Sequence, residues 1–339
     1  MPRPSVPRDT PFLAHSVSWT GGEPHLVISI PLETERRTLN LVGERLAFHV
    51  DPTGRFCTGV FIATGSSGGR HEPCAGARLA TTGRQCERCA SRDESRFMHH
   101  AHRGGHVPEA LGRYLAQPHW LYIATFADGA HKVGTASDAR KRVRLDEQGA
   151  VRATYVARTD DGLAVRVLED AVTEHVGVPQ ARHKTSKAAA LTRALHETAL
   201  DGAHADCVAA VEAHLRTRGL CARSMPHEAW QPPALHAAFF DAGRGIHPVY
   251  AHPVTGGSHC LTPVSLVGSV ALVQVNAASE AEAEAEAEGV AEAEGVAGDA
   301  AEGAADSLML VDLDALGGRR VTFDDAARSP ESVAQHSLF

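Results

Sequence analysis

The sequence predicts an α+β fold, in which a small antiparallel sheet with helices is flanked by a β-rich region on each side. Short runs of strand-forming residues fill the chain up to about residue 62 and return after residue 264. Between them, two strand-like runs meet at Asp128 and Gly129, a dipeptide typical of hairpin turns. Helix-like segments follow this hairpin as far as about residue 217. A chain of 339 residues is long enough for two or three domains.

We expect three regions along the chain. Residues 1–107 form a β-rich region with a cluster of cysteines, residues 116–220 form the α/β core, and residues 221–339 form the second β-rich region. The sequence leaves open whether the two β-rich regions make one domain or two.

The elements of these regions follow from their residue patterns. The strands expected before the cysteine cluster are 26–30, 37–41 and 46–50, and a Gly/Ser-rich loop follows at 65–69. The core is expected to contain strands 120–126, 131–135 and 151–158, with helices over 139–147, 162–176 and 187–217. A break near Asp201 and Gly202 would divide the last helical stretch. The later strands are expected at 264–276, 308–313 and 320–323.

Residues 277–306 repeat Ala, Glu and Gly, a pattern without the apolar stripe that a helix needs for packing. We expect a disordered insert here, and a solvated transient helix is the alternative. Ten acidic residues and no Lys or Arg fall in this insert, so the formal net charge of −8 overstates the acidity of the folded part. A nearly neutral folded part neither requires nor excludes a nucleic-acid partner.

No run approaches the roughly 18 apolar residues of a membrane span. The N-terminal residues also lack the apolar stretch of a signal peptide. We therefore expect no membrane association and a cytoplasmic location. Thiols stay reduced in that compartment, where clustered cysteines more often bind metal than form disulfides.

Four of the seven cysteines lie close together in the sequence, and we predict that they form a structural zinc site: Cys57, Cys74, Cys86 and Cys89. The last two form a C-x2-C pair, which lets two thiolates of one turn bind a tetrahedral ion. The same motif occurs in redox proteins, but here it does not open a helix of a βαβ unit. His71 is the alternative to Cys57 as a ligand. A second group of histidines could form another metal site, although a solvated linker is the preferred interpretation: His99, His100, His102 and His106.

Polar residues of the expected core suggest a second site. Tyr122 lies on the first hairpin strand, Lys132 and Gly134 lie on the second, and Glu169 lies at the edge of the apolar face of the 162–176 helix. Basic residues cluster on the helix after the hairpin: Arg140, Lys141, Arg142 and Arg144. An arginine can donate two hydrogen bonds to one phosphate. Each residue also has a simpler interpretation: a core aromatic, a solvated helix face, or a carboxylate paired with Arg166 or Lys184.

In order and spacing, Tyr122, Lys132-Val133-Gly134, Arg142 and Glu169 resemble the core of the GIY-YIG nucleases. The resemblance covers roughly residues 118–180. It implies that Tyr122, Lys132, Arg142 and Glu169 surround one divalent ion, Mg²⁺ or Mn²⁺, bound by Glu169. The sequence departs from that family in two places. Its first motif lacks the glycine, and Lys132 stands where those nucleases usually have a tyrosine.

The whole layout also resembles a prokaryotic family of unknown function. That family places a cysteine-rich region before a core with segments like His119-x-Leu121-Tyr122-Ile123-Ala124, Lys132-Val133-Gly134-Thr135 and Gln148-Gly149-Ala150. This match is closer than the nuclease match, and no activity comes with it.

From these patterns we expect a zinc-stabilised protein that binds nucleic acid, with Arg140, Lys141 and Arg144 contacting phosphate. Metal-dependent cleavage of phosphodiesters is the further expectation of the nuclease resemblance. An exposed lysine ammonium stays protonated near neutral pH, so Lys132 is not expected to replace a phenol as a base. The rival hypothesis is a catalytically inactive protein-interaction or scaffold module.

Overall fold

The computed structural model describes residues 9–330 except for 32, 34, 66–67, 183, 218, 220–224, 242–246 and 277–307. The predicted insert at 277–306 lies outside the described residues. The fold is a mixed α+β fold with antiparallel sheets, as the sequence predicts.

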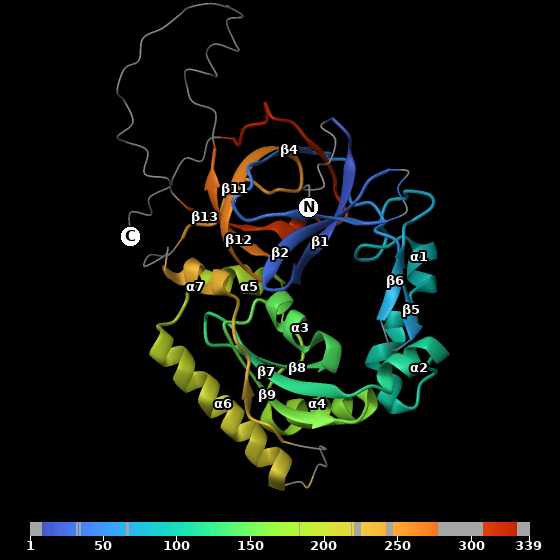
Figure 1. Ribbon diagram of the computed structural model, residues 1–339, viewed down its shortest axis with the longest axis vertical. Helices are drawn as coiled ribbons and strands as arrows, with labels where there is room; N and C mark the ends of the chain where they lie inside the picture. The colour runs from blue at the N-terminus through green and yellow to red at the C-terminus, as the bar shows by residue number, and fades with distance from the viewer. Residues whose placement is uncertain are drawn as a thin grey trace, which may run out of the picture.

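One sheet of eight strands combines both β-rich regions (Figure 1). The early strands are β1 (Phe12–Thr20), β2 (Glu23–Ser29), β3 (Arg37–Asn40) and β4 (Leu46–Val50). The late strands are β11 (Gly257–Val267), β12 (Val270–Val275), β13 (Met309–Asp312) and β14 (Arg320–Phe323). Their order is β13-β12-β11-β4-β14-β1-β2-β3, so β4 lies between two strands from the other end of the chain. The two β-rich regions therefore share one sheet.

The apolar face of this sheet forms the largest buried core. Side chains from early and late strands meet there, among them Phe12, Trp19, Phe48 and Leu261. The turn between β1 and β2 consists of Gly21 and Gly22, whose φ angles are +63° and +86°. Two consecutive residues with positive φ make the tight turn that suits a right-twisted hairpin, and glycine adopts it without a steric penalty.

The second sheet has the order β10-β9-β7-β8 and is antiparallel throughout. Its strands are β7 (His119–Thr125), β8 (His131–Ser137), β9 (Arg152–Thr159) and the short β10 (Glu228–Ala229). Helix α3 (Lys141–Gln148) packs on one face. Helices α4 (Gly162–Val176) and α6 (Glu197–Thr217) cover the other. The strand β8 is therefore an outer strand of the sheet.

The predicted break of the last helical stretch is wrong in position. Helix α6 runs through Asp201 and Gly202, and the interruption lies earlier, at 192–196, after α5 (Lys184–Leu191). A glycine inside a helix is tolerated when packing offsets its lower helix propensity, and Val208, Val211 and Leu215 of α6 are buried in the core. A later helix, α7 (Ala234–Asp241), lies in a region that the sequence analysis assigned to strand and loop. No helix within the described ranges has the length and apolar character needed to cross a membrane.

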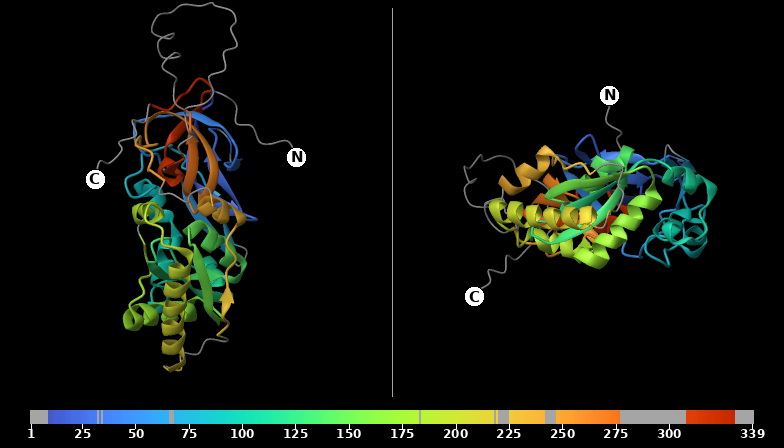
Figure 2. Two further views of the ribbon diagram at one scale, coloured as in Figure 1. Left: turned by 90° about the vertical axis from the view of Figure 1, so that its left-hand side faces the viewer. Right: turned by 90° about the horizontal axis from the view of Figure 1, so that it is seen from below.

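A third group of elements connects the two sheets along one side (Figures 1 and 2). It contains the hairpin β5 (Val60–Gly65) and β6 (Gly68–Glu72), helix α1 (Glu87–Arg92) and helix α2 (Glu109–Leu115). Two 3₁₀ turns lie between these helices, η1 (Glu94–His99) and η2 (Ala101–Arg103). Of the predicted Gly/Ser-rich loop, Gly65 ends β5 and Gly68 and Gly69 begin β6, and residues 66–67 lie outside the described residues.

Candidate functional site

The four predicted cysteines meet in space. The sulfur atoms of Cys57, Cys74, Cys86 and Cys89 all lie within 4.8 Å of one another. Cys57 comes from the loop before β5, Cys74 from the segment after β6, and the last two from the start of α1. Three of these side chains are buried and Cys74 is half-buried. Four thiol sulfurs at this separation form a group that could hold a metal ion.

Backbone amides support thiolates at this cluster. The Gly59 N–H donates to the Cys57 sulfur over 3.4 Å. The Cys89 N–H does the same for Cys86 and is the main reason that the pKa of this thiol falls to about 7. Burial acts in the opposite direction on Cys57 and Cys89, and raises the pKa of both thiols. Thiols with raised pKa values lose their protons when a cation binds, because the metal stabilises the thiolate.

His71 does not compete for the cluster in this structure. Its Nε2–H donates to the carbonyl oxygen of Thr58, and its ring lies edge-on to that of His15, with 5.0 Å between the centroids. Cys57 therefore completes the group, and the choice that the sequence left open between Cys57 and His71 falls to the cysteine.

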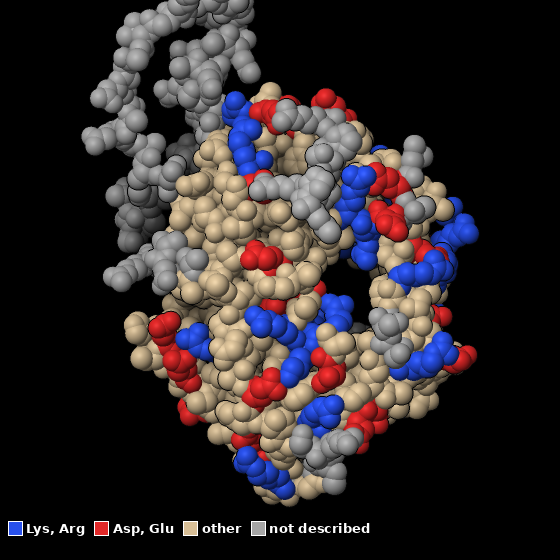
Figure 3. Space-filling model, viewed as in Figure 1, with Lys and Arg blue, Asp and Glu red and all other residues tan. Residues whose placement is uncertain are grey.

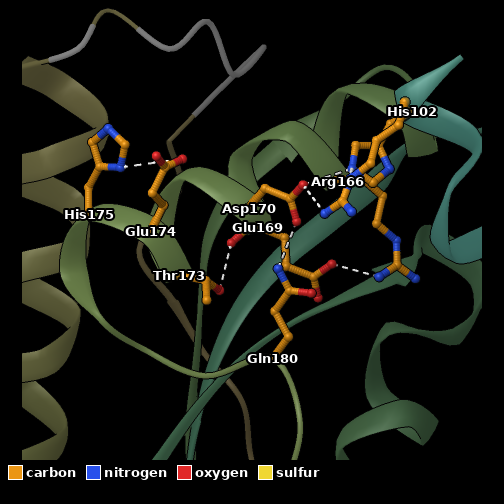
Figure 4. A network of polar contacts seen from close by, with 9 residues as sticks. His102, Arg166, Glu169, Asp170, Thr173, Glu174, His175 and Gln180 are labelled. Atoms are coloured by element: carbon orange, nitrogen blue, oxygen red, sulfur yellow. Dashed lines mark hydrogen bonds and ion pairs between the residues drawn. The ribbon is translucent and has the colours of Figure 1, made fainter.

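His102 lies in the segment that connects the two sheets, residues 60–115, and it binds a carboxylate of α4. Nε2 of His102 lies 2.9 Å from Oδ2 of Asp170 in α4, and Arg103 and Gln180 bind the same carboxylate (Figure 4). Within the described residues, the four cysteines are the group of three or more candidate ligands that is close enough to share an ion. His102 thus ties the connecting segment to α4.

The predicted hairpin brings Tyr122 and Gly134 directly opposite each other. A Cβ atom at Gly134 would lie 2.5 Å from the Tyr122 hydroxyl oxygen, so any larger residue at this position would displace the tyrosine ring. Tyr122 is fully buried, and burial raises the pKa of its phenol, while the positive charge of Arg144 acts in the opposite direction. A phenol in this environment stays protonated near neutral pH.

Lys132 is buried on the same face of the hairpin, with 8% of its surface exposed. Its Nζ donates to Oε1 of Gln148 over 3.0 Å. Burial, and then the charges of Arg144 and Lys187, lower the pKa of Lys132 to about 8, and the charge of Glu169 opposes them. The expectation of an exposed amine at this position is therefore wrong, because the sheet and α3 remove the amine from water. With this pKa the amine is still mostly protonated at neutral pH.

Glu169 is held by an arginine of its own helix. Its side chain is buried, and Oε2 accepts a hydrogen bond of 2.6 Å from Nη1 of Arg166, one turn earlier in α4 (Figure 4). Burial raises the pKa of the carboxyl group and Arg166 lowers it. Of the two pairings considered from the sequence, the one with Arg166 is confirmed. The carboxylate is therefore already bound to a cation of the protein itself.

Arg144, rather than Arg142, lies beside this group. Side chains two residues apart on a helix point in nearly opposite directions, because each residue turns the helix by about 100°. The charge of Arg144 acts on Tyr122 and Lys132, whereas that of Arg142 acts on Asp146 and Tyr155. The structure therefore brings Tyr122, Lys132 and Glu169 together and leaves Arg142 outside.

The remaining basic residues of α3 differ in their contacts. Lys141 lies over the ring of Trp120, with 3.9 Å from Nζ to the centroid, and pairs with Glu228 over 2.7 Å. Arg140 pairs with Glu147 over 3.1 Å. No carboxylate in the described part of the chain pairs with Arg144. Lys and Arg side chains gather over α3 in the space-filling view (Figure 3).

A cavity of about 290 Å³ lies beside Arg144 of α3 and Arg166 of α4. Three arginines line it, Arg140, Arg144 and Arg166, and none of the described residues that line it is Asp or Glu. The other polar and aromatic lining residues are Ser95, Tyr114, His119, Thr135 and Ser137. A cavity with several cations and no anion in its wall favours an anionic ligand.

Arg166, Tyr114 and His119 were not selected as site residues from the sequence. Arg166 had a local signal, because it precedes Glu169 by three residues and faces the same side of the helix. Tyr114 had none, and His119 belonged only to the motif shared with the family of unknown function. Tyr114 enters the cavity because α2 packs against the start of α4, a contact between segments that the sequence pattern does not relate.

Comparison with known proteins identifies a family. Residues 45–228 match the family described as Protein of unknown function (DUF2797). The matched range begins just before β4 and ends in β10, so it contains the cysteine cluster, Tyr122, Lys132, Glu169 and the cavity. No curated protein and no solved structure matches the chain. Because the match spans more than half of the chain, the protein belongs to this family of unknown function.

Proposed function

We propose that this protein binds nucleic acid, and that the cavity beside α3 contacts the phosphates. The observation that supports the proposal best is the convergence of Arg140, Arg144 and Arg166 on a cavity without a carboxylate in its described wall. A guanidinium group can donate two parallel hydrogen bonds to the oxygens of one phosphate, and Thr135 and Ser137 add hydroxyl donors. The expected phosphate contact of Arg144 is part of this proposal, and Arg166 joins it.

The proposal assigns zinc to the cysteine cluster. Four sulfurs in a closed group are typical of structural Zn²⁺ sites, and no open coordination position is needed. Such a site would hold the β5–β6 hairpin, α1 and the loop before β5 in one arrangement. Reduced cysteines of this kind are typical of the cytoplasm, where we place the protein.

The proposal keeps the resemblance of the core to the GIY-YIG nucleases. Support comes from Tyr122 packed over Gly134, with Lys132 on the same face of β8 and the charge of Glu169 acting on both Tyr122 and Lys132. In this assignment Arg144 takes the part that the sequence comparison gave to Arg142.

Phosphate binding can be tested with labelled DNA and RNA oligonucleotides and the variant Arg144→Ala. We expect affinity to fall about tenfold. The slope of log K against log salt concentration should become shallower by about one, the change expected for the loss of one phosphate contact. Arg142→Ala is the matched control, because it removes an exposed arginine from the same helix but outside the cavity. Equal losses of affinity for both variants would show that only the net charge of the helix matters, and would contradict a role for the cavity. Binding of no DNA or RNA by the intact protein would favour the scaffold hypothesis.

Metal-dependent cleavage is the second candidate function. The feature that favours it is the burial of Lys132 on the same face of the hairpin as Tyr122, because burial lowers the pKa of the amine to about 8 and leaves a minor fraction of it neutral near pH 7. Lys132 is not among the described residues that line the cavity. The donor set fits a divalent ion less well. Arg166 pairs with the Glu169 carboxylate, and no described residue that lines the cavity is Asp or Glu. The geometry thus supports binding better than hydrolysis.

The cleavage assay uses Mg²⁺ and Mn²⁺ with supercoiled DNA and structured RNA. Nicking that Glu169→Ala abolishes and Glu174→Ala leaves intact would make the protein a nuclease; Glu174 is an exposed carboxylate of the same helix. Binding without nicking under these conditions would leave the phosphate-binding function alone.

A further inference from the structure

The cavity beside α3 has two chemically different walls. Arg144 and Arg166 form the cationic wall. Another part of the lining comes from Tyr114 of α2 and Met98 of η1, in the segment that connects the two sheets, and from His119 at the start of β7. The rings of Tyr114 and His119 pack edge to face, with 5.6 Å between their centroids. A ligand that fills this space meets both positive charge and polarisable apolar surface.

The polar atoms between these walls suit the edge of a nucleobase. Nδ1 of His119 lies 2.8 Å from the Gln117 carbonyl oxygen and donates to it when the ring is neutral. Burial lowers the pKa of His119, so the neutral ring is favoured and Nε2 is left as an acceptor. On the outer strand β8, the Val133 N–H donates away from the sheet to Pro179, over 3.0 Å. Because amide direction alternates along a strand, the Thr135 amide faces the same side.

The size of the cavity limits what can enter it. At about 290 Å³ it lies at the lower end of the range for small-molecule sites, which suits one nucleotide unit. In a regular duplex the bases are stacked and paired, and only the phosphates and groove edges reach a protein. A base enters such a cavity only from a single strand, an end, or a position extruded from the helix.

We propose that this cavity takes one unpaired nucleotide, with its phosphate on Arg144 and Arg166 and its base against Tyr114 and His119. The inference rests on the proposed function and adds the substrate class: unpaired positions of a strand rather than the duplex backbone. It also gives the connecting segment a direct part in recognition, since Tyr114 and Met98 belong to it.

The test compares three fluorescent oligonucleotides of one sequence with the intact protein: a single strand, a blunt duplex, and the same duplex with one bulged nucleotide. We expect the single strand and the bulged duplex to bind about tenfold more tightly than the blunt duplex. Tyr114→Ala should weaken binding of the single strand and of the bulged duplex about tenfold and leave binding of the blunt duplex unchanged, because base stacking is lost. Tyr114→Phe should retain the preference, since it keeps the ring.

Phe61→Ala is the matched control, because Phe61 is an exposed aromatic residue outside the cavity lining. A free mononucleotide is added as a competitor of the single strand. Competition would show that the cavity binds an isolated nucleotide, and its absence would show that the nucleotide must be part of a strand. Equal binding of all three oligonucleotides, with an Arg144→Ala defect, would overturn this inference and keep the phosphate-binding proposal. A Tyr114→Ala variant that binds like the parent protein would overturn it too. Failure of every oligonucleotide to bind would reject both proposals.

Discussion

Lys132 carries a cationic group into the interior of the core, where its amine donates a hydrogen bond of 3.0 Å to Gln148. Its charge is therefore unfavourable in the folded state and freely solvated in the unfolded state. A buried amine of this kind is more common at functional sites than in ordinary cores, since structural packing alone would favour an apolar residue. The position that departs from the nuclease pattern is thus also a position with unusual electrostatics.

Lys132→Met should stabilise the protein at pH 7. The folded-state pKa of about 8 lies below the ordinary value of 10.5, so the unfolded chain binds more protons between these values. The free energy of unfolding therefore rises with pH from about 8 to 10.5, and the burial penalty, about 3 kcal/mol, is present in full below pH 8. After the lost hydrogen bond to Gln148 is subtracted, we expect a gain of about 2 kcal/mol.

Urea denaturation at pH 7 and pH 9.5 measures this difference, with Arg142→Met as a control that removes an exposed cation from α3. The gain from Lys132→Met should shrink at the higher pH. A variant that is less stable than the parent at pH 7, or a gain that does not change with pH, would contradict the burial argument.

Among the elements, β10 is the shortest strand, and it is fixed by the residue that follows it. Trp230 is buried against α3 and β9, its backbone N–H donates to Ala153 over 3.0 Å, and its Nε1–H donates to Oδ1 of Asp146 over 3.1 Å. Asp146 is also buried, and burial raises its pKa to about 6. One tryptophan thus satisfies a buried carboxylate and closes the face of the sheet that carries Tyr122.

Replacement of Trp230 should separate packing from hydrogen bonding at this element. Trp230→Phe keeps a ring but leaves the Asp146 carboxylate without this donor, and we expect a loss of about 1–3 kcal/mol. Trp230→Ala removes the packing as well and should lose about 3–5 kcal/mol. Thermal and urea denaturation measure both losses. If Asp146→Asn in the Trp230→Phe background recovers no stability, the carboxylate is not the cause.

At the scale of the whole molecule, the cysteine cluster joins three segments around a small apolar group. The loop before β5, the segment after β6 and helix α1 meet at the four sulfurs. Backbone hydrogen bonds of Cys57 and Thr58 to Arg78 and Arg84 also hold the loop before β5 to the segment after β6. The same connecting segment then forms one wall of the cavity through Met98 and Tyr114. Loss of the metal should therefore affect the cavity as well as the cluster.

We expect the purified protein to contain about one zinc ion per chain, and Cys57→Ser to lose most of it. Because metal binding and local folding are coupled, this variant should lower the thermal midpoint and weaken oligonucleotide binding about tenfold or more. Cys207→Ser is the control, since Cys207 lies in α6 away from the cluster. Elemental analysis that finds no metal, or a Cys57→Ser variant with full zinc content, would reject the assignment.

The sequence alone determined the features that depend on neighbouring residues. The hairpin at Asp128 and Gly129, the helix after it and the buried face of α4 follow from turn chemistry and apolar periodicity. The four-cysteine group followed from spacing, because a C-x2-C pair needs two more sulfurs to close a tetrahedral site. The Arg166–Glu169 pair was also within reach, since the two residues lie one helical turn apart.

Tertiary structure alone decided everything that depends on distant segments meeting. Only the sheet order shows that β4 lies between β11 and β14 and that the two β-rich regions are one unit. The choice of Arg144 over Arg142 depends on the rotation of α3 about its axis, and a run of four basic residues within five positions cannot reveal it. The burial that shifts Lys132, and the arrival of Tyr114 in the same cavity as the arginines, have the same origin. Local patterns fix which face of an element is apolar, whereas packing fixes which polar residue at its edge reaches a common cavity.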